Sequence, residues 1–304
     1  MIIGFVGAGL MGAPILRHLL AAGHEVLVSA GDRARVDALL SEGARWRDIP
    51  AALAAEADVF FSCRVTPEQS RETFLGAQGV VAGARRGLLC VDLSTIDPAT
   101  ARQIGAGLDA IGVGFLDAPI SGGPDGAEAR TLTVIAGGAE ADIARARPVL
   151  ALFAKAVLHM GPVGAGVTAK LCNNLVSITT HALLAEAVAL AGRAGIAADR
   201  LYEVLHVSSA QSRTLERMLP GHVLPRDFAA KATITTIMKD LDCAIDTASE
   251  LGLHLLLPAT ARLRFEQAVS LGLGEADISS VLLAVEAERA TARDPGTDGG
   301  QLTG

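Results

Sequence analysis

Hydrophobic positions in the first half of the chain follow two alternating periods. Short apolar runs typical of β-strands are separated by Ala- and Leu-rich stretches, in which apolar residues recur at helical spacing. This alternation predicts βαβ units and a mostly parallel sheet. We expect strands at residues 2–6, 25–29, 59–63, 88–93, 114–117, 131–136 and 157–160, and helices at residues 13–22, 33–42 and 100–111.

The pattern changes after the turn-rich segment 161–166. An Ala/Leu/Val-rich run over residues 167–194 contains no proline, and Gly195 ends it, which predicts one long helix. Further helices are expected at residues 199–207, 231–251, 258–271 and 278–290. The fold class is therefore α/β: a Rossmann-type, mostly parallel sheet domain (1–162) followed by an all-α C-terminal domain (163–290) opened by a long interdomain helix. Residues 291–304 are rich in Gly and Asp and are expected to form a disordered tail.

Composition narrows the classes of partner. The 304 residues carry a formal net charge of −7 without a Lys/Arg cluster, which argues against nucleic acid and anionic membranes. No uncharged apolar run reaches membrane-spanning length, and the N-terminus lacks the basic start of a signal peptide. The four cysteines form no C-x-x-C pair, and no His lies at metal-ligand spacing from them. We therefore expect a cytoplasmic protein with reduced thiols and no metal.

A glycine motif follows the first strand without a break. A G-x-G-x-x-G between a strand and a helix is typical of dinucleotide binding, because the helix N-terminus offers free N–H groups to a pyrophosphate. Gly7 would permit the tight turn, Gly9 the approach of the phosphates, and Gly12 close packing of helix on strand. A purely structural turn is the alternative. The expected cofactor-binding residues here are Gly7, Ala8, Gly9, Leu10, Met11 and Gly12.

The end of the second strand bears on the choice of cofactor. Asp32 lies about 20 residues beyond Gly12, where an acid would bind the ribose 2′-hydroxyl of NAD. Arg33 and Arg35 follow it and would suit the 2′-phosphate of NADP. All three could equally be solvated charges at a helix start. The sequence predicts NAD or NADP, with a slight preference for NAD.

Two further segments carry candidate chemistry. Ser121, Gly122 and Gly123 follow a strand, and two glycines allow consecutive N–H groups to converge on an anion; a simple turn is the alternative. Lys170 and Asn174 lie four residues apart on the long helix, so they share one face. A helical lysine is usually solvated, but this one begins an apolar helix at the expected domain junction.

These segments together resemble the β-hydroxyacid dehydrogenase family, which includes 3-hydroxyisobutyrate dehydrogenase and tartronate semialdehyde reductase (2-hydroxy-3-oxopropionate reductase). The resemblance spans residues 2–287 and rests on four ordered motifs rather than on the glycine motif alone. The motifs are FVGAGLMG at residues 5–12, DAPISGG at 117–123, GAGVTAKLCNN at 164–174 and KDL at 239–241.

The resemblance implies roles for individual residues. Lys170 would be the general acid/base, Asn174 would hydrogen-bond the substrate, and the loop of Ser121, Gly122 and Gly123 would hold its carboxylate. The family's cofactor contacts map onto Thr95 and Lys239, and Val65 and Thr66 would line the same crevice with weaker support; Phe228 would close the pocket or belong to the core. Two departures from the family pattern are Asp32 at the end of the second strand and Arg130 near the substrate loop.

The implied function is an NAD(P)-dependent oxidoreductase that interconverts a small β-hydroxy acid and its semialdehyde. Candidate substrates are 3-hydroxyisobutyrate, glycerate with tartronate semialdehyde, serine and 4-hydroxybutyrate. The alternatives are an imine reductase, which in the family pattern lacks Lys170, and a catalytically silent NAD(P)-binding protein. A 6-phosphogluconate dehydrogenase would need a longer helical domain. The apolar surface of the long helix predicts a homodimer or homotetramer.

Overall fold

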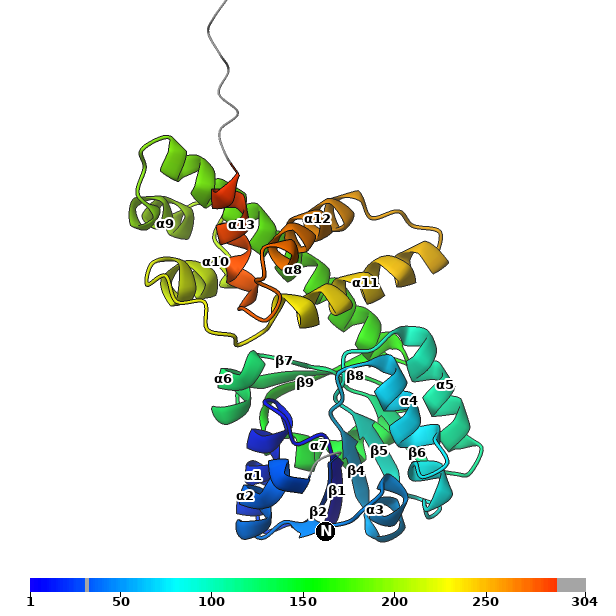
Figure 1. Ribbon diagram of the computed structural model, residues 1–304. Coiled ribbons are helices and arrows are strands. Elements are labelled where there is room, and N and C mark those ends of the chain that lie inside the picture. The colour runs from blue at the N-terminus through cyan, green and yellow to red at the C-terminus, as the bar shows by residue number, and fades with distance from the viewer. Residues whose placement is uncertain (31–32, 289–304) are drawn as a thin grey trace, which may run out of the picture.

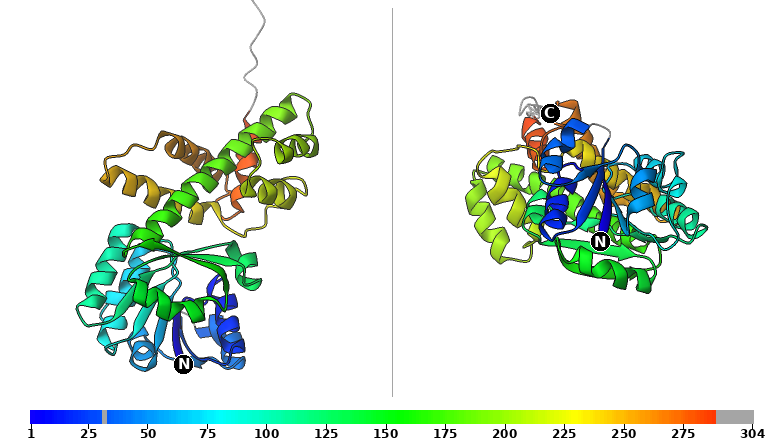
Figure 2. Two further views of the ribbon diagram at one scale, coloured as in Figure 1. Left: turned by 180° about the vertical axis from the view of Figure 1, so that it is seen from behind. Right: turned by 90° about the horizontal axis from the view of Figure 1, so that it is seen from below.

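The computed structural model describes residues 1–30 and 33–288. A sheet domain forms one end of the molecule and a helical domain the other, and the long helix α8 (Ala165–Arg193) runs from the first into the second (Figures 1 and 2). This arrangement confirms the predicted fold class. Asp32 and the expected disordered tail at 291–304 lie outside the described residues.

Within the described residues, nine strands form one sheet in the order β3-β2-β1-β4-β5-β6-β8-β7, with β9 on the other side of β8. Pairing is parallel except where β8 meets β6 and β7. The order of the strands changes direction at the boundary between β1 and β4. An open α/β sheet binds ligands at such a boundary, at the carboxyl edge of its strands. The strands are β1 (Ile2–Val6), β2 (Glu25–Ser29), β3 (Arg45–Trp46), β4 (Val59–Ser62), β5 (Leu89–Asp92), β6 (Gly114–Asp117), β7 (Ile120–Ser121), β8 (Leu132–Gly137) and β9 (Ala154–Gly161).

Helices cover both faces of this sheet. Several begin with proline after a residue in extended conformation, and Thr66 and Asp97 cap α4 and α5 through their side chains. The helix predicted at 33–42 is instead a 3₁₀ turn (Arg33–Val36) followed by the short α2, because the chain leaves helical geometry at Val36, which no side chain caps. The helices are α1 (Gly12–Ala21), α2 (Asp37–Ser41), α3 (Pro50–Glu56), α4 (Pro67–Leu75), α5 (Pro98–Asp109), α6 (Gly123–Glu128) and α7 (Glu140–Leu150).

The helical domain is built around α8. Four later helices, α10 to α13, pack against it. The helix predicted at 231–251 begins only at Ile234, because the Thr233 side chain caps it by accepting a hydrogen bond from Thr236 N. The helix predicted at 278–290 starts as a 3₁₀ turn (Ile278–Ser280), and its last two residues lie outside the described part of the chain. The helices are α9 (Ala198–Val207), α10 (Arg213–Met218), a π-helical turn (Leu219–Val223), α11 (Ile234–Glu250), α12 (Leu256–Ser270) and α13 (Val281–Ala287).

Each domain has its own core. Stacked and edge-on aromatic rings, including Phe61 against Phe5 and Phe153, fill one side of the sheet, and Phe74 against Phe60 and Phe115 fills the other. In the helical domain the buried side chains of α8 pack around Leu215, Met218 and Phe265. Helix α8 contributes buried side chains to both domains.

Helix α8 is long and apolar enough, by length and composition alone, to cross a membrane. A core helix passes the same test. Here Ile178, Ala182 and Ala185 are buried under neighbouring helices, and the helix carries the polar Lys170 and Asn174 on its buried side. These contacts identify α8 as the central helix of a packed domain.

Candidate active site

The glycine loop has the form that a pyrophosphate-binding turn needs. A Cβ on Gly7, which has a φ of +105°, would lie 2.1 Å from the carbonyl oxygen of Cys63, and a Cβ on Gly12 would lie 1.9 Å from that of Gly7. A Cβ on Gly9 would meet no atom within 4 Å. Gly7 and Gly12 are thus demanded by packing, whereas Gly9 faces open space at the start of α1. No side chain caps that helix N-terminus.

This difference separates the roles of the two outer glycines from that of the middle one. We expect Gly7→Ala to lower the apparent free energy of unfolding by about 2 kcal/mol or more, because the added methyl overlaps backbone in a left-handed conformation. Gly9→Ala should change it by less than about 0.5 kcal/mol, yet weaken NADH and NADPH binding about tenfold or more. Urea unfolding and fluorescence titration check both. Equal loss of stability in the two variants would contradict the assignment.

Among the remaining predicted cofactor residues, two follow β1 and β2 and two follow β4. Leu10 is 73% exposed beside the glycine loop, and Arg33 lies with its guanidinium 5.7 Å from the centre of the Trp46 ring. Val65 follows β4 and is exposed, whereas Thr66 is engaged as the cap of α4, its Oγ1 accepting from Gln69 N at 3.3 Å. The loop containing Val65 is tied to the loop after β5 because Arg64 N donates to Ser94 Oγ at 2.8 Å.

The segment after β7 presents hydrogen-bond donors. Gly122 has a φ of +140° and Gly123 a φ of +68°, and within the described residues neither amide donates a hydrogen bond. The Ser121 hydroxyl has no hydrogen-bond partner there either. Two free amides at a turn that enters α6 form the kind of concavity that binds an anion. The loop is connected to α8 through β8, which pairs with β7 and packs against that helix.

Lys170 and Asn174 lie on consecutive turns of α8, each only 8% exposed. The start of α8 is held by Asp117 at the end of β6, whose two carboxylate oxygens accept from Gly164 N at 2.7 Å and Val167 N at 2.8 Å. Burial raises the pKa of Asp117 to about 6. Asp117 therefore fixes the position of Lys170 relative to the edge of the sheet.

A buried network crosses from the helical domain to the sheet domain. Asn174 Nδ2 donates to Asp240 Oδ2 at 2.8 Å, and Asp240 Oδ1 lies 2.7 Å from the ammonium of Lys239. Lys239 Nζ in turn donates to the carbonyl oxygen of Thr95 at 2.7 Å. The sequence motif indicated Lys239 but gave no role to Asp240, which links Asn174 to Lys239. The signal that could have indicated Asp240 in the sequence was an acidic residue directly after a lysine on a helix.

Lys170 has no hydrogen bond to any part of the chain that the structure describes. Burial lowers its pKa, and Lys239 adds to this effect, while Asp240 opposes it. An ammonium group without a hydrogen-bond partner in such a place is costly. Burial without a partner therefore disfavours the charged form of this lysine.

Two residues that the sequence singled out have other contacts. Arg130 has a left-handed backbone, with a φ of 57°, and its Nε donates to His18 Nδ1 at 3.1 Å. Phe228 is half-buried, and the Arg226 guanidinium lies 5.6 Å from the centre of its ring. Neither contact involves Ser121, Lys170 or Asn174.

Two family patterns match nearly the whole chain. The NAD binding domain of 6-phosphogluconate dehydrogenase matches residues 2–161, and the NAD-binding domain of NADP-dependent 3-hydroxyisobutyrate dehydrogenase matches residues 164–285. With the glycine loop and the sheet order, these matches define an NAD(P)-dependent dehydrogenase.

Individual relatives agree with this class. The chain is 32% identical to 2-(hydroxymethyl)glutarate dehydrogenase of Eubacterium barkeri, with 92% of this chain and 93% of the relative covered. It is 36% identical to 3-hydroxyisobutyrate dehydrogenase of Pseudomonas aeruginosa, with 86% and 89% covered. The protein belongs to the β-hydroxyacid dehydrogenase family, as the sequence motifs predicted.

Solved structures rank the alternatives. The Mycobacterium tuberculosis 3-hydroxyisobutyrate dehydrogenase with L-serine superimposes with a TM-score of 0.87 at 32% identity, covering 94% of this chain and 99% of that one. An imine reductase from Pseudomonas sp. gives a TM-score of 0.62 at 19% identity, covering 93% and 98%. The second likeness shows a shared fold alone.

Proposed function

We propose that this protein interconverts a small β-hydroxy acid and its semialdehyde, with Lys170 as the general acid/base. The observation that carries the proposal is the buried, unbonded ammonium of Lys170 one helical turn before Asn174. The substrates proposed are of the 3-hydroxyisobutyrate or the glycerate/tartronate semialdehyde type, and the first type is the one in the name of the Pseudomonas aeruginosa relative. The substrate carboxylate would bind the Ser121 hydroxyl and the free amides of Gly122 and Gly123.

The glycine loop fits a dinucleotide, because Gly9 leaves room for phosphates at the uncapped start of α1. Gly7, Gly9 and Gly12 would hold the pyrophosphate, and the carbonyl-bound Lys239 beside Thr95 would border the nicotinamide end. When bound, the coenzyme supplies the acceptor or donor of the hydride.

The protein's own residues move one proton. In oxidation, neutral Lys170 accepts the proton of the substrate hydroxyl as the carbonyl bond forms. In reduction, the Lys170 ammonium returns that proton to the developing alkoxide. Asn174 is held by Asp240, and its Oδ1 accepts from Asn173 Nδ2 at 3.2 Å. The fixed amide keeps a lone pair and an N–H with which to orient the substrate hydroxyl.

An absorbance assay at 340 nm tests the proposal. It measures both NAD and NADP with 3-hydroxyisobutyrate, glycerate, serine and 4-hydroxybutyrate, and runs the matching semialdehydes in reverse. Turnover of at least one β-hydroxy acid is expected. Reduction of cyclic imines without any hydroxy-acid turnover would make the protein an imine reductase. Cofactor binding without any turnover would make it a silent binding protein.

The same assay decides the coenzyme. NAD is the proposed preference, because Asp32 follows β2 at the spacing of a ribose-binding acid. Arg33, over the Trp46 ring, offers the guanidinium that a 2′-phosphate would need. A cytoplasmic location is proposed on the four free cysteines.

We also propose a homodimer or homotetramer assembled through α8. Val176, Leu183 and Leu190 are 71%, 64% and 72% exposed and recur every seven residues, so they form one apolar stripe. Light scattering is expected to show a dimer or tetramer. Leu183→Glu should shift the protein towards monomer, whereas Ile111→Glu, at an exposed position of the sheet domain, should not. A monomeric wild type would contradict the proposal.

A further inference from the structure

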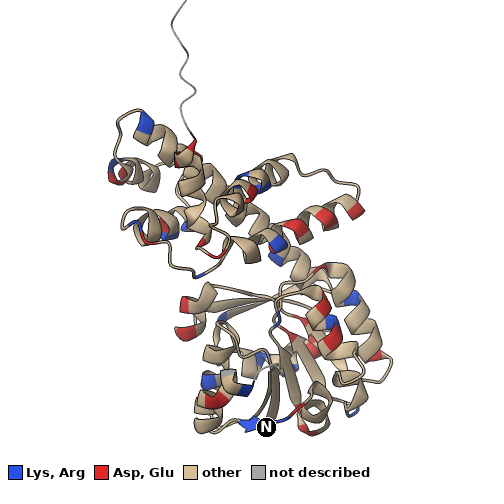
Figure 3. Cartoon of the chain, viewed as in Figure 1, with Lys and Arg blue, Asp and Glu red and all other residues tan. Residues whose placement is uncertain are grey.

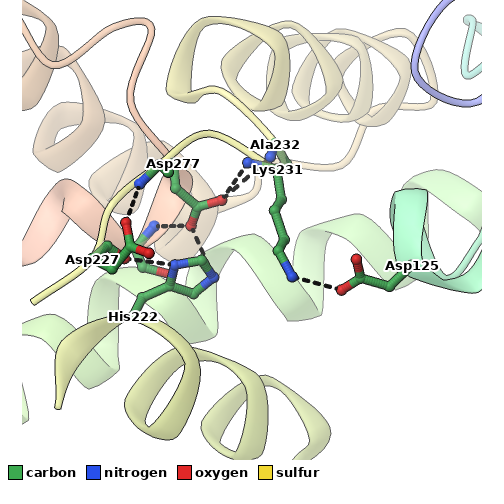
Figure 4. Close-up of polar contacts among 8 residues, drawn as sticks. Asp125, His222, Asp227, Lys231, Ala232 and Asp277 are labelled. Carbon is green, nitrogen blue, oxygen red and sulfur yellow. Dashed lines mark hydrogen bonds and ion pairs between the residues drawn. The ribbon is translucent and has the colours of Figure 1, made fainter. Parts of the chain in front are cut away.

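Three cations of the helical domain reach the sheet domain, and two of them do so at or near the candidate substrate loop. Lys239 donates to the carbonyl of Thr95, and Lys231 forms a 2.8 Å ion pair with Asp125 on α6 (Figure 4). The third is Arg217 on α10, whose Nη2 lies 3.3 Å from the position that a Cβ on Gly123 would occupy. The first two cations are paired. Arg217 makes no hydrogen bond or ion pair with the described residues.

The Arg217 side chain is exposed, and contacts of α10 fix the backbone from which it extends. The hydroxyl of Ser212 caps α10 by accepting from Leu215 N at 3.1 Å. The side chains of Leu215 and Met218 are fully buried in the helical core. The neighbouring Thr214 hydroxyl lies 3.3 Å from that of Ser177 on α8. The helix is therefore anchored on α8, the helix that also carries Lys170 and Asn174.

The groups that face each other here are all donors. On one side are the Ser121 hydroxyl and the Gly122 and Gly123 amides, and on the other is the Arg217 guanidinium. The nearby acids have partners of their own. Asp125 pairs with Lys231, and Asp277 accepts from the Lys231 and Ala232 amides and faces the His222 ring at 3.7 Å (Figure 4).

The charge of Arg217 already acts on this region. The pKa of Asp125 is lowered mainly by its hydrogen bond from Lys231, and Arg217 and His222 lower it further. Basic and acidic residues occur on both domains (Figure 3). The hydrogen-bond donors around Gly123, together with the positive charge of Arg217, favour an anion at this place.

We propose that Arg217 is a further substrate-binding residue, which holds the carboxylate of the hydroxy acid against the Ser121–Gly123 loop from the opposite domain. The inference rests on the proposed function and extends it. A guanidinium presents two parallel N–H groups that match a carboxylate, whereas the loop offers single donors. The carboxylate would then bridge the two domains, and the site would select acids over esters and simple alcohols.

The test compares Arg217→Met with wild type, using 3-hydroxyisobutyrate and its methyl ester. Loss of a charge-assisted pair should raise KM for the acid about 10- to 100-fold, with a smaller change in kcat. KM for the ester should change less than about threefold. Arg213→Met, one turn earlier on α10, is the matched control, and Arg217→Lys should recover part of the affinity. NADPH binding should stay unchanged in all variants.

The outcomes separate this proposal from the proposed function. Equal KM values in wild type and Arg217→Met, or equal losses for acid and ester, would overturn the role of Arg217. Malate, a hydroxy dicarboxylate, is tested as a further substrate. A loss of affinity confined to malate would place Arg217 at a second carboxylate and overturn its assignment to the loop. If the wild type turns over no substrate, calorimetry still tests the role of Arg217 by measuring the binding of 3-hydroxyisobutyrate in the presence of NADP⁺. Weaker binding by the variant would support the proposal, and absence of binding by wild type would overturn it.

Discussion

Lys170→Ala should lower kcat about 1,000-fold in both directions, because the change removes the buried amine, of lowered pKa, that is proposed to exchange a proton with the substrate. Lys170 makes no hydrogen bond to the described chain, so its removal leaves no acceptor of the fold unpaired. The dissociation constants of NADH and NADPH should change less than about twofold. Stopped-flow or steady-state absorbance measures the rate, and fluorescence titration measures coenzyme binding.

A lysine elsewhere provides the control for this prediction. Lys155→Ala, at an exposed position of β9, removes the same charge and should leave kcat unchanged. Retention of more than about a tenth of the wild-type rate by Lys170→Ala would reject Lys170 as the general acid/base. Loss of coenzyme binding in the same variant would instead indicate a structural role.

The lowered pKa of Lys170 also predicts a pH profile. Oxidation requires the neutral amine, so its rate should rise with pH and level off below the ordinary lysine value of 10.5. Reduction requires the ammonium and should fall as the pH rises through the same pKa. Lys170→Arg should show neither limb, because a guanidinium does not deprotonate in this range.

Asp117→Ala should lower the apparent free energy of unfolding by about 2–4 kcal/mol, since it leaves the buried amides of Gly164 and Val167 without acceptors. The same change frees the start of α8 and should reduce kcat at least about tenfold through misplacement of Lys170. Urea unfolding followed by circular dichroism measures the first effect. Asp109→Ala, at the exposed end of α5, is the control and should have neither effect.

The raised pKa of Asp117 also predicts how its contribution to stability changes with pH. The carboxyl binds a proton at about pH 6 in the folded protein, above its ordinary value of 3.8. The native state therefore holds more protons than the unfolded state between about pH 4 and 6, and this group's contribution to stability falls as the pH rises through that range. The difference between wild type and Asp117→Ala should be larger at pH 4.5 than at pH 7. A difference that grows with pH would contradict this account.

Sequence periodicity predicted most elements that carry a strong pattern. The buried strands β1, β2, β4 and β6 lie within one residue of their expected bounds, and α8 lies within two. Missing from the prediction were β3 and β7, which have two residues each, α6 and α10, which have six, and also α3, α4 and α7, which have seven, nine and eleven. The shortest of these elements contain less than two periods of a pattern, so tertiary contacts decide them. In α4 and α7 charged residues interrupt the apolar repeat.

The motifs located the glycine loop, Lys170 and Asn174 in the sequence. The roles assigned to these residues stay predictions. Two contacts were not predicted, because each joins residues distant in sequence: Asn174 is 66 residues from Asp240, and Gly123 lies on the other domain from Arg217. No local pattern carries such a pairing.

Transfer of deuterium from a substrate labelled at its carbinol carbon is the most direct test of the central claim. 3-Hydroxyisobutyrate deuterated at C3, incubated with the protein and NAD⁺ or NADP⁺, should give reduced coenzyme with one deuterium at C4 of the nicotinamide and a labelled semialdehyde, both visible by NMR. Reduced coenzyme without deuterium, or bound coenzyme that acquires no label from this substrate or from labelled glycerate, serine or 4-hydroxybutyrate, would contradict the claim that this protein moves a hydride from a β-hydroxy acid.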